Sequence, residues 1–301
     1  MNLIETTLLL IFGGLAIAAL FYVKSRHRRN AAQGDVQAAI EAASLMQQLF
    51  GAMQQHRGMS SAWLAGDASF EQRLIERQRE INVQLRAFLL IAERETAQAW
   101  PCFTRNDAVM FRHHWEELVS QLAKLSSEQA IARHTRLITQ VIDWLAALGE
   151  ARIRLASPTL DVTLARNFTE RLPLLAECLG QARALGSSSA ASGMCSPVAR
   201  VRLAFLASRA ESLLLQASAG GSGSALETTE RTCIRLIKTI REDILQPTTV
   251  TISAGQYFEL ATQAIDGLFD WMRNCGTHLN NYPQQARPSG GEAHRITSTN
   301  S

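Results

Sequence analysis

Three arginines lie on or beside apolar helical faces, where a charged side chain is unusual. Arg57 falls in the middle of one apolar stripe, Arg183 at the edge of a second, and Arg241 beside a third. The stripe around Arg57 consists of Met46, Leu49, Phe50, Met53 and Leu64. A guanidinium stays protonated in a protein, and its planar fork of donors matches a planar oxyanion. Such arginines predict either buried ion pairs or a site for a small planar anion.

Small and hydroxyl-bearing residues surround the first two arginines. Ser60 and Ser61 follow Arg57, and Ser187 follows Arg183. Small side chains leave room beside a guanidinium, and their hydroxyl groups can donate hydrogen bonds to an anion. Arg57, Arg183, Arg241, Ser60, Ser61 and Ser187 are therefore candidate residues for such a ligand site.

Buried ion pairs are the competing explanation for the same arginines. An isolated charge in a core costs several kcal/mol, and a carboxylate partner is the usual way to offset that cost. Asp143 and Asp266 recur at equivalent places in the chain and are candidate partners. The residues alone leave both interpretations open.

Two short matches suggest that the chain contains a duplication. "RGMSSAWLAGD" from Arg57 aligns with "RALGSSSAASG" from Arg183, an offset of 183 − 57 = 126. "TQVIDWL" from Thr139 aligns with "TQAIDGL" from Thr262, an offset of 262 − 139 = 123. Because the offsets nearly agree, the matches predict two related halves with a boundary near Ser157.

The elements that position these residues are all predicted to be helices. Apolar residues make up 47% of the chain, helix formers dominate, and no stretch alternates convincingly with a period of two. We expect helices near residues 36–65, 69–99, 107–125, 128–156, 160–192, 197–218, 225–245 and 254–279. This pattern predicts an all-α fold of two pseudo-repeated antiparallel four-helix bundles, residues 36–156 and 160–280. The polar tail, residues 283–301, is expected to be disordered.

The N-terminal segment has the pattern of a membrane anchor. Residues 7–23, "TLLLIFGGLAIAALFYV", carry no charge and reach the lower length limit of a spanning helix. The basic run "KSRHRR" follows, and basic flanks stay on the cytoplasmic side. We predict a single-pass anchor within residues 1–30 in the inner membrane, with the soluble domain in the cytoplasm. A cleaved signal peptide and a periplasmic domain are the alternative, although a signal peptide has its basic residues before the apolar run.

Other functions find little support in the sequence. The net charge of +3 gives no argument for nucleic-acid binding, and the five cysteines contain no CxxC pair. His113 and Glu117 are four residues apart on an expected helix, but no third metal ligand accompanies them. We predict no enzyme activity, no metal and no cofactor. Gly14 and Ala18 have the small-xxx-small spacing of packed membrane helices, which makes a homodimer possible.

Several segments resemble the nitrate- and nitrite-sensing (NIT) domain. "QQHRGMSSAWL" followed by "FEQRLIERQREIN" is similar to the opening of that domain. "LGQARALGSSSAASG" and "ISAGQYFELATQAIDGLF" are similar to its second half, so the resemblance spans roughly residues 36–280. It implies two four-helix bundles with nitrate or nitrite held by arginines between helices. Arg57 matches the arginine of the first helix and Arg183 the arginine of the second half. Arg241 is a looser assignment, for which Arg231 and Arg235 are alternatives.

Two functions from different classes follow. The first is a membrane-anchored sensor that binds nitrate or nitrite and signals to a separate partner protein, since no output domain is recognised after residue 280. The second is a membrane-tethered helical scaffold that acts by protein contacts without a ligand. A shared location for Arg57 and Arg183 favours the sensor, whereas separate ion pairs favour the scaffold.

Overall fold

The computed structural model describes residues 3–64, 66–155, 160–219 and 224–285, which form helices and short connections with no β-strand among them. Side chains at residues 3–21, 23, 25–33, 224–225 and 282–285 lie outside the described set. The first bundle contains α1 (Leu3–Leu64), α2 (Glu71–Thr96), α3 (Arg105–Gln121) and α4 (Ser127–Leu148). Single 3₁₀ turns, η1 (Ala68–Phe70) and η2 (Leu122–Lys124), lie in its connections.

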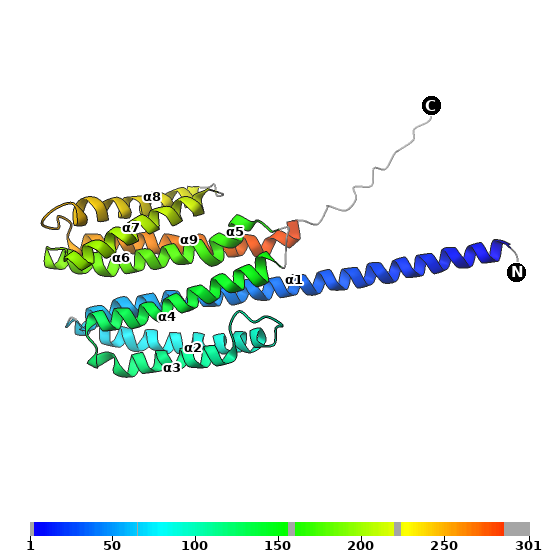
Figure 1. The fold of residues 1–301 in the computed structure, drawn as a ribbon, viewed down its shortest axis with the longest axis horizontal. Coiled ribbons are helices and arrows are strands. Elements are labelled where there is room, and N and C mark those ends of the chain that lie inside the picture. The colour runs from blue at the N-terminus through cyan, green and yellow to red at the C-terminus, as the bar shows by residue number, and fades with distance from the viewer. Residues whose placement is uncertain (1–2, 65, 156–159, 220–223, 286–301) are drawn as a thin grey trace, which may run out of the picture.

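The second bundle lies beside the first (Figure 1). It contains α5 (Val162–Arg166), α6 (Leu172–Ser192), α7 (Pro197–Ser218), α8 (Ser224–Thr239) and α9 (Ala254–Gln285). Three π-helical turns, η3 (Gly149–Arg154), η4 (Asn167–Arg171) and η5 (Ile240–Leu245), extend or join these helices. Since η4 joins α5 to α6 without a break, the described residues form eight long helices. The expected all-α class is confirmed.

Local capping explains several of the helix boundaries. Thr104 and Ser126 each form a reciprocal capping box with the residue three positions later, so α3 and α4 begin there. Ser196 caps α7 ahead of Pro197, and Gly193 ends α6 in the left-handed conformation with φ 69°. Gly66 supplies the turn after α1 with φ 104°. Two further connections between the expected helices contain residues 156–159 and 220–223, which lie outside the described residues.

The first helix is longer than expected. The sequence predicted a bundle helix from residue 36, but α1 runs from Leu3 to Leu64 without interruption. No proline occurs in these 62 residues, so nothing removes a backbone donor or forces a kink. Figure 1 shows α1 extending well beyond the two bundles.

The ends of the chain are only partly described. Of the predicted anchor, residues 7–23, the structure describes one side chain, that of Tyr22, and the rest lie outside the described residues. Among the residues that the structure describes, no helix is both long and apolar enough to cross a membrane. At the other end, α9 includes residues 283–285 of the predicted tail, and residues 286–301 lie outside the description.

The two bundles meet along α1 and α4 of the first bundle and α6, η4 and α9 of the second. The rings of Phe50 on α1 and Phe269 on α9 lie 5.2 Å apart between centroids. A Cβ added at Gly51 would lie 3.0 Å from the Phe269 ring, so a larger residue would require this ring to shift. Gln47 Nε2 donates a hydrogen bond of 2.6 Å to the backbone carbonyl of Phe168 in η4. Polar and aromatic contacts thus join the two bundles, whose buried apolar side chains form one continuous core.

Candidate functional site

Arg57 is buried at the interface between the two bundles, with 2% of its surface exposed. Its guanidinium donates from Nη1 to Glu177 Oε1 at 2.6 Å and from Nη2 to Glu177 Oε2 at 3.1 Å. Nη1 also donates to Thr135 Oγ1 on α4 at 2.8 Å. The charge in the apolar stripe of α1 is therefore matched by a carboxylate from α6. The acids named in the sequence analysis, Asp143 and Asp266, are both exposed.

The carboxylate of Glu177 accepts four hydrogen bonds. Besides the two from Arg57, Oε2 accepts from Gln54 Nε2 at 2.7 Å and Oε1 accepts from Gln181 Nε2 at 3.0 Å. Glu177 is 5% exposed, so water contributes little to this network. The guanidinium of Arg57 and the side-chain amides of Gln54 and Gln181 thus all donate to one planar anionic group, the carboxylate of Glu177.

Arg183 of α6 faces the same interface from the other side. Its Nη1 donates to Thr262 Oγ1 on α9 at 3.1 Å, and its guanidinium lies 5.2 Å from the ring centroid of Phe258. No carboxylate of the described residues forms an ion pair with it. Burial lowers the pKa of Arg183, and the positive charge of Arg57 lowers it further, against a smaller opposing effect of Asp266.

The contacts of the two arginines correspond to each other. Arg57 donates to Thr135, 78 residues later, and Arg183 donates to Thr262, 79 residues later. The threonines are therefore offset by 262 − 135 = 127, close to the offset of the arginines, 183 − 57 = 126. The sequence match that begins at Thr139 lies one helical turn beyond Thr135, the residue that makes the contact.

Each arginine also lies over a glycine of the opposite helix. A Cβ added at Gly180 on α6 would be 2.9 Å from Arg57 Nη2, and one added at Gly58 on α1 would be 3.9 Å from Arg183 Nη2. Glu177 breaks this correspondence, because 177 − 126 = 51 and position 51 is Gly51. Among the described residues, Arg57 forms an ion pair with a carboxylate and Arg183 does not.

The three predicted serines have different surroundings. Ser60 Oγ is buried 3.2 Å from Nδ1 of His56, and Ser61 Oγ shares a 2.8 Å hydrogen bond with Ser127 Oγ. Ser187 Oγ lies one helical turn after Arg183 and is buried without a hydrogen-bond partner among the described residues. Of the three hydroxyl groups, that of Ser187 is the one without a hydrogen-bond partner among the described residues.

The sequence analysis did not find a buried histidine pair beside Arg57. His134 Nδ1 lies 2.7 Å from the carbonyl of Ala130 and must carry the proton, so Nε2 accepts from His56 Nδ1 at 2.7 Å. Gln78 Nε2 donates to His56 Nε2 at 3.2 Å. Burial lowers the pKa of His56 to about 2 and that of His134 to about 4. Both rings are therefore neutral and firmly positioned.

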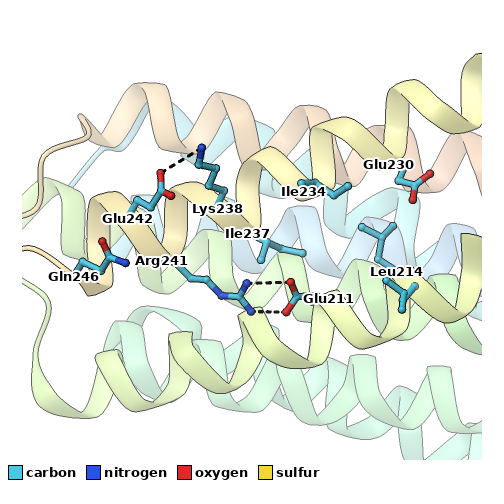
Figure 2. A pocket seen from close by; sticks show the side chains of 10 residues that line it. Glu211, Leu214, Glu230, Ile234, Ile237, Lys238, Arg241, Glu242 and Gln246 are labelled. Carbon is cyan, nitrogen blue, oxygen red and sulfur yellow. Dashed lines mark hydrogen bonds and ion pairs between the residues drawn. The ribbon is translucent and has the colours of Figure 1, made fainter.

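Arg241 lies in a different environment. It is partly exposed in η5 and donates to Glu211 of α7 from Nη1 at 3.0 Å and from Nη2 at 2.5 Å. Figure 2 shows this pair beside a groove of about 340 Å³ between α7 and α8. The structure brings Arg57 and Arg183 together and gives Arg241 an ion pair of its own. The alternatives, Arg231 and Arg235, are also exposed on α8.

The described residues do not bring together the ligands of a metal site. They contain no group of three or more histidine, cysteine, aspartate or glutamate side chains that could hold a metal ion. His113 is exposed on α3, and all five cysteines are free. The donors at the interface between α1 and α6 are suited to an anion.

Comparison with known proteins agrees with this architecture. The family model described as nitrate and nitrite sensing (NIT) matches residues 48–280. Among solved structures, the chain is similar to "Structure of the NasR transcription antiterminator", with a TM-score of 0.69 and 18% sequence identity. That similarity covers 89% of this chain and 75% of the other. No curated protein matches the chain.

Proposed function

The chain belongs to the nitrate- and nitrite-sensing (NIT) family, and from this premise we propose that it binds nitrate or nitrite between α1 and α6 through Arg57 and Arg183. The family match covers both arginines. Nitrate and nitrite are planar, and their oxygens fit a guanidinium fork in the same way as a carboxylate does.

The observation that carries this proposal is the environment of Arg183. Its guanidinium lies at the interface between the bundles, donates to Thr262 and has no ion-pair partner among the described residues. A bound anion would offset the free energy lost when this charge leaves water. Ser187 Oγ, buried one turn away and unpartnered in the described structure, would supply a neutral donor.

A scaffold without a ligand remains the second candidate, and a specific observation favours it. Arg57 is already paired with Glu177, so this arginine has a structural role whether or not an anion binds. The ligand proposal therefore depends on Arg183 more than on Arg57. Calorimetric titration with nitrate and with nitrite, using chloride at the same ionic strength as a control, separates the two functions. Binding no stronger than that of chloride would leave the scaffold.

For the location and output of the protein we propose a membrane-anchored sensor. The apolar residues 7–23 would span the inner membrane once, and the basic run after them would hold the domain in the cytoplasm. Because α1 is one continuous helix, Arg57 is joined to residue 24 by about 50 Å of helix at 1.5 Å per residue. A change at the arginines could thus reach the membrane end of α1 and a separate partner protein.

The same proposal includes a duplicated architecture. The paired arginine–threonine contacts support two related halves, residues 36–156 and 160–280, each built as an antiparallel four-helix bundle. Gly14 and Ala18 would allow two anchors to pack as a homodimer.

A further inference from the structure

The carboxylate of Glu177 has the shape of the proposed ligand. A carboxylate and a nitrate each present two oxygens on one planar edge, and both accept parallel hydrogen bonds from an arginine fork. In this structure the edge of Glu177 receives the Nη1 and Nη2 donors of Arg57 at 2.6 and 3.1 Å. A side chain of the protein therefore occupies the fork that an anion would use.

The surroundings of this carboxylate are also those of an anion site. Gln54 and Gln181 add two amide donors at 2.7 and 3.0 Å, and Arg57 is further held by Thr135. Gly180 leaves the space beside Arg57, where a Cβ would lie 2.9 Å from Nη2. These donors do not depend on the occupant being covalently attached to α6, since each would bond equally to a free planar oxyanion.

A buried arginine at this interface does not require a carboxylate such as Glu177 to hold it in place. The related Arg183 is held by Thr262 and Phe258 without an ion pair among the described residues, and the position corresponding to Glu177 is Gly51. The carboxylate is thus an addition to one arginine of the pair. It also links the bundles, because Arg57 and Gln54 lie on α1 whereas Glu177 lies on α6.

We propose that Glu177 is an internal competitor for the anion site, which occupies the fork of Arg57 in the absence of ligand and is displaced when nitrate or nitrite binds. This inference rests on the proposed function. Displacement exchanges one planar anion for another, so Arg57 keeps a partner throughout. The bond between α1 and α6 is broken, however, because the free anion is not attached to either helix. Glu177 would in this way set both the affinity and the signal of the site.

The test compares nitrate affinity in the full-length chain and in Glu177→Gln. Glutamine keeps the size of the side chain but removes the charge that competes with the ligand. We expect nitrate to bind at least about tenfold more tightly to this variant, since a hydrogen bond to a charged group contributes about that factor or more. Glu170→Gln, an exposed change of the same charge at the start of the same helix, should leave the affinity unchanged.

The possible results are distinct. If the unaltered chain binds nitrate and Glu177→Gln binds it equally or more weakly, Glu177 does not compete with the ligand. The proposed function would then stand without this inference. Absence of nitrate binding in both proteins would overturn both proposals. If Glu177→Gln does not fold, Glu177→Asp provides the measurement, because a shorter carboxylate reaches Arg57 less well and should also tighten nitrate binding. A nitrate-bound structure that retains both bonds from Arg57 to Glu177 would contradict displacement directly.

Discussion

Arg57 of α1 and Arg183 of α6 approach each other across the interface between the bundles, and only Arg57 has a carboxylate partner among the described residues. Burial lowers the pKa of Arg183, and repulsion from the like charge of Arg57 lowers it further. Glu177 neutralises one charge and leaves the other with hydroxyl and aromatic neighbours. The asymmetry of the pair, more than the presence of two arginines, determines what each substitution is expected to do.

The ion pair between Arg57 and Glu177 should show strong coupling. Arg57→Ala leaves a buried carboxylate without its charged partner and is expected to lower the free energy of unfolding by about 3–5 kcal/mol. The double variant Arg57→Ala with Glu177→Ala should lose less than the sum of the single changes, because neither charge is then stranded. Urea denaturation of the unaltered chain, the two single variants and the double variant gives the coupling free energy. Additive losses would mean that the pair makes no net interaction.

Nitrate should stabilise the folded chain, and Arg183 should be essential for that effect. A ligand at one hundred times its Kd adds about 2.7 kcal/mol to the free energy of unfolding, which raises the Tm by about 2–4 °C per kcal/mol for a domain of this size. Arg183→Ala should abolish the shift and keep the helical circular dichroism. Arg183→Lys should also show no nitrate-dependent rise in Tm, because an ammonium group lacks the planar fork.

Arg241→Ala is the matched control for these variants. It also removes one arginine, but from an exposed ion pair with Glu211, which is worth about 0–1 kcal/mol. We expect the nitrate-dependent rise in Tm to be the same as in the unaltered chain. A loss of the shift in Arg241→Ala would place this arginine in the site, as the sequence analysis proposed.

The sequence identified Arg57 as a candidate site residue, but it did not predict that Glu177 is the partner of Arg57. Arg57 interrupts an apolar stripe whose period is visible over a few turns of α1. Glu177 lies on α6, which is buried on almost every side between residues 172 and 180, so its partner cannot be assigned from a single helical face. The pairing also joins residues 120 positions apart, a separation that local periodicity does not address.

The positions of the helices were predictable, whereas the π-helical turns were not. Capping residues such as Ser126 and the glycine at 66 mark where helices begin and end. A π turn adds one residue to a turn without any change in composition, and η3, η4 and η5 therefore lie inside segments that simply read as helical. The buried pair His56 and His134 was not predicted, because its members come from different helices, α1 and α4, and lie 78 residues apart in the sequence.

The histidine pair predicts a loss of stability in mild acid. Burial lowers the pKa values of His56 and His134 to about 2 and about 4, whereas an unfolded histidine titrates near about 6.5. Below that value the unfolded chain binds more protons than the folded one, so the free energy of unfolding falls as the pH decreases. Two such groups give a slope of up to about 2.7 kcal/mol per pH unit between about pH 6 and about pH 4.

Urea denaturation at several pH values measures this slope. His56→Gln with His134→Gln should flatten it in the window above about pH 5, where carboxylates contribute least. As a control, His113→Gln with His114→Gln should leave the slope unchanged, because both side chains are exposed on α3. An equal slope in the buried-pair variant would mean that other groups control the acid response.

The basic run at residues 24–29 should determine the orientation of the proposed anchor. Lys and Arg next to a spanning segment remain on the cytoplasmic side, and Lys24, Arg26, Arg28 and Arg29 all follow the apolar run. A fluorescent reporter that folds only in the cytoplasm should be active when fused after Ser301, and alkaline phosphatase at the same position should be inactive. Replacing the four basic residues by glutamine should weaken this bias and raise the phosphatase signal, because the charge difference across residues 7–23 then disappears. Phosphatase activity from the unaltered fusion would instead place the arginine interface in the periplasm and exclude a cytoplasmic partner.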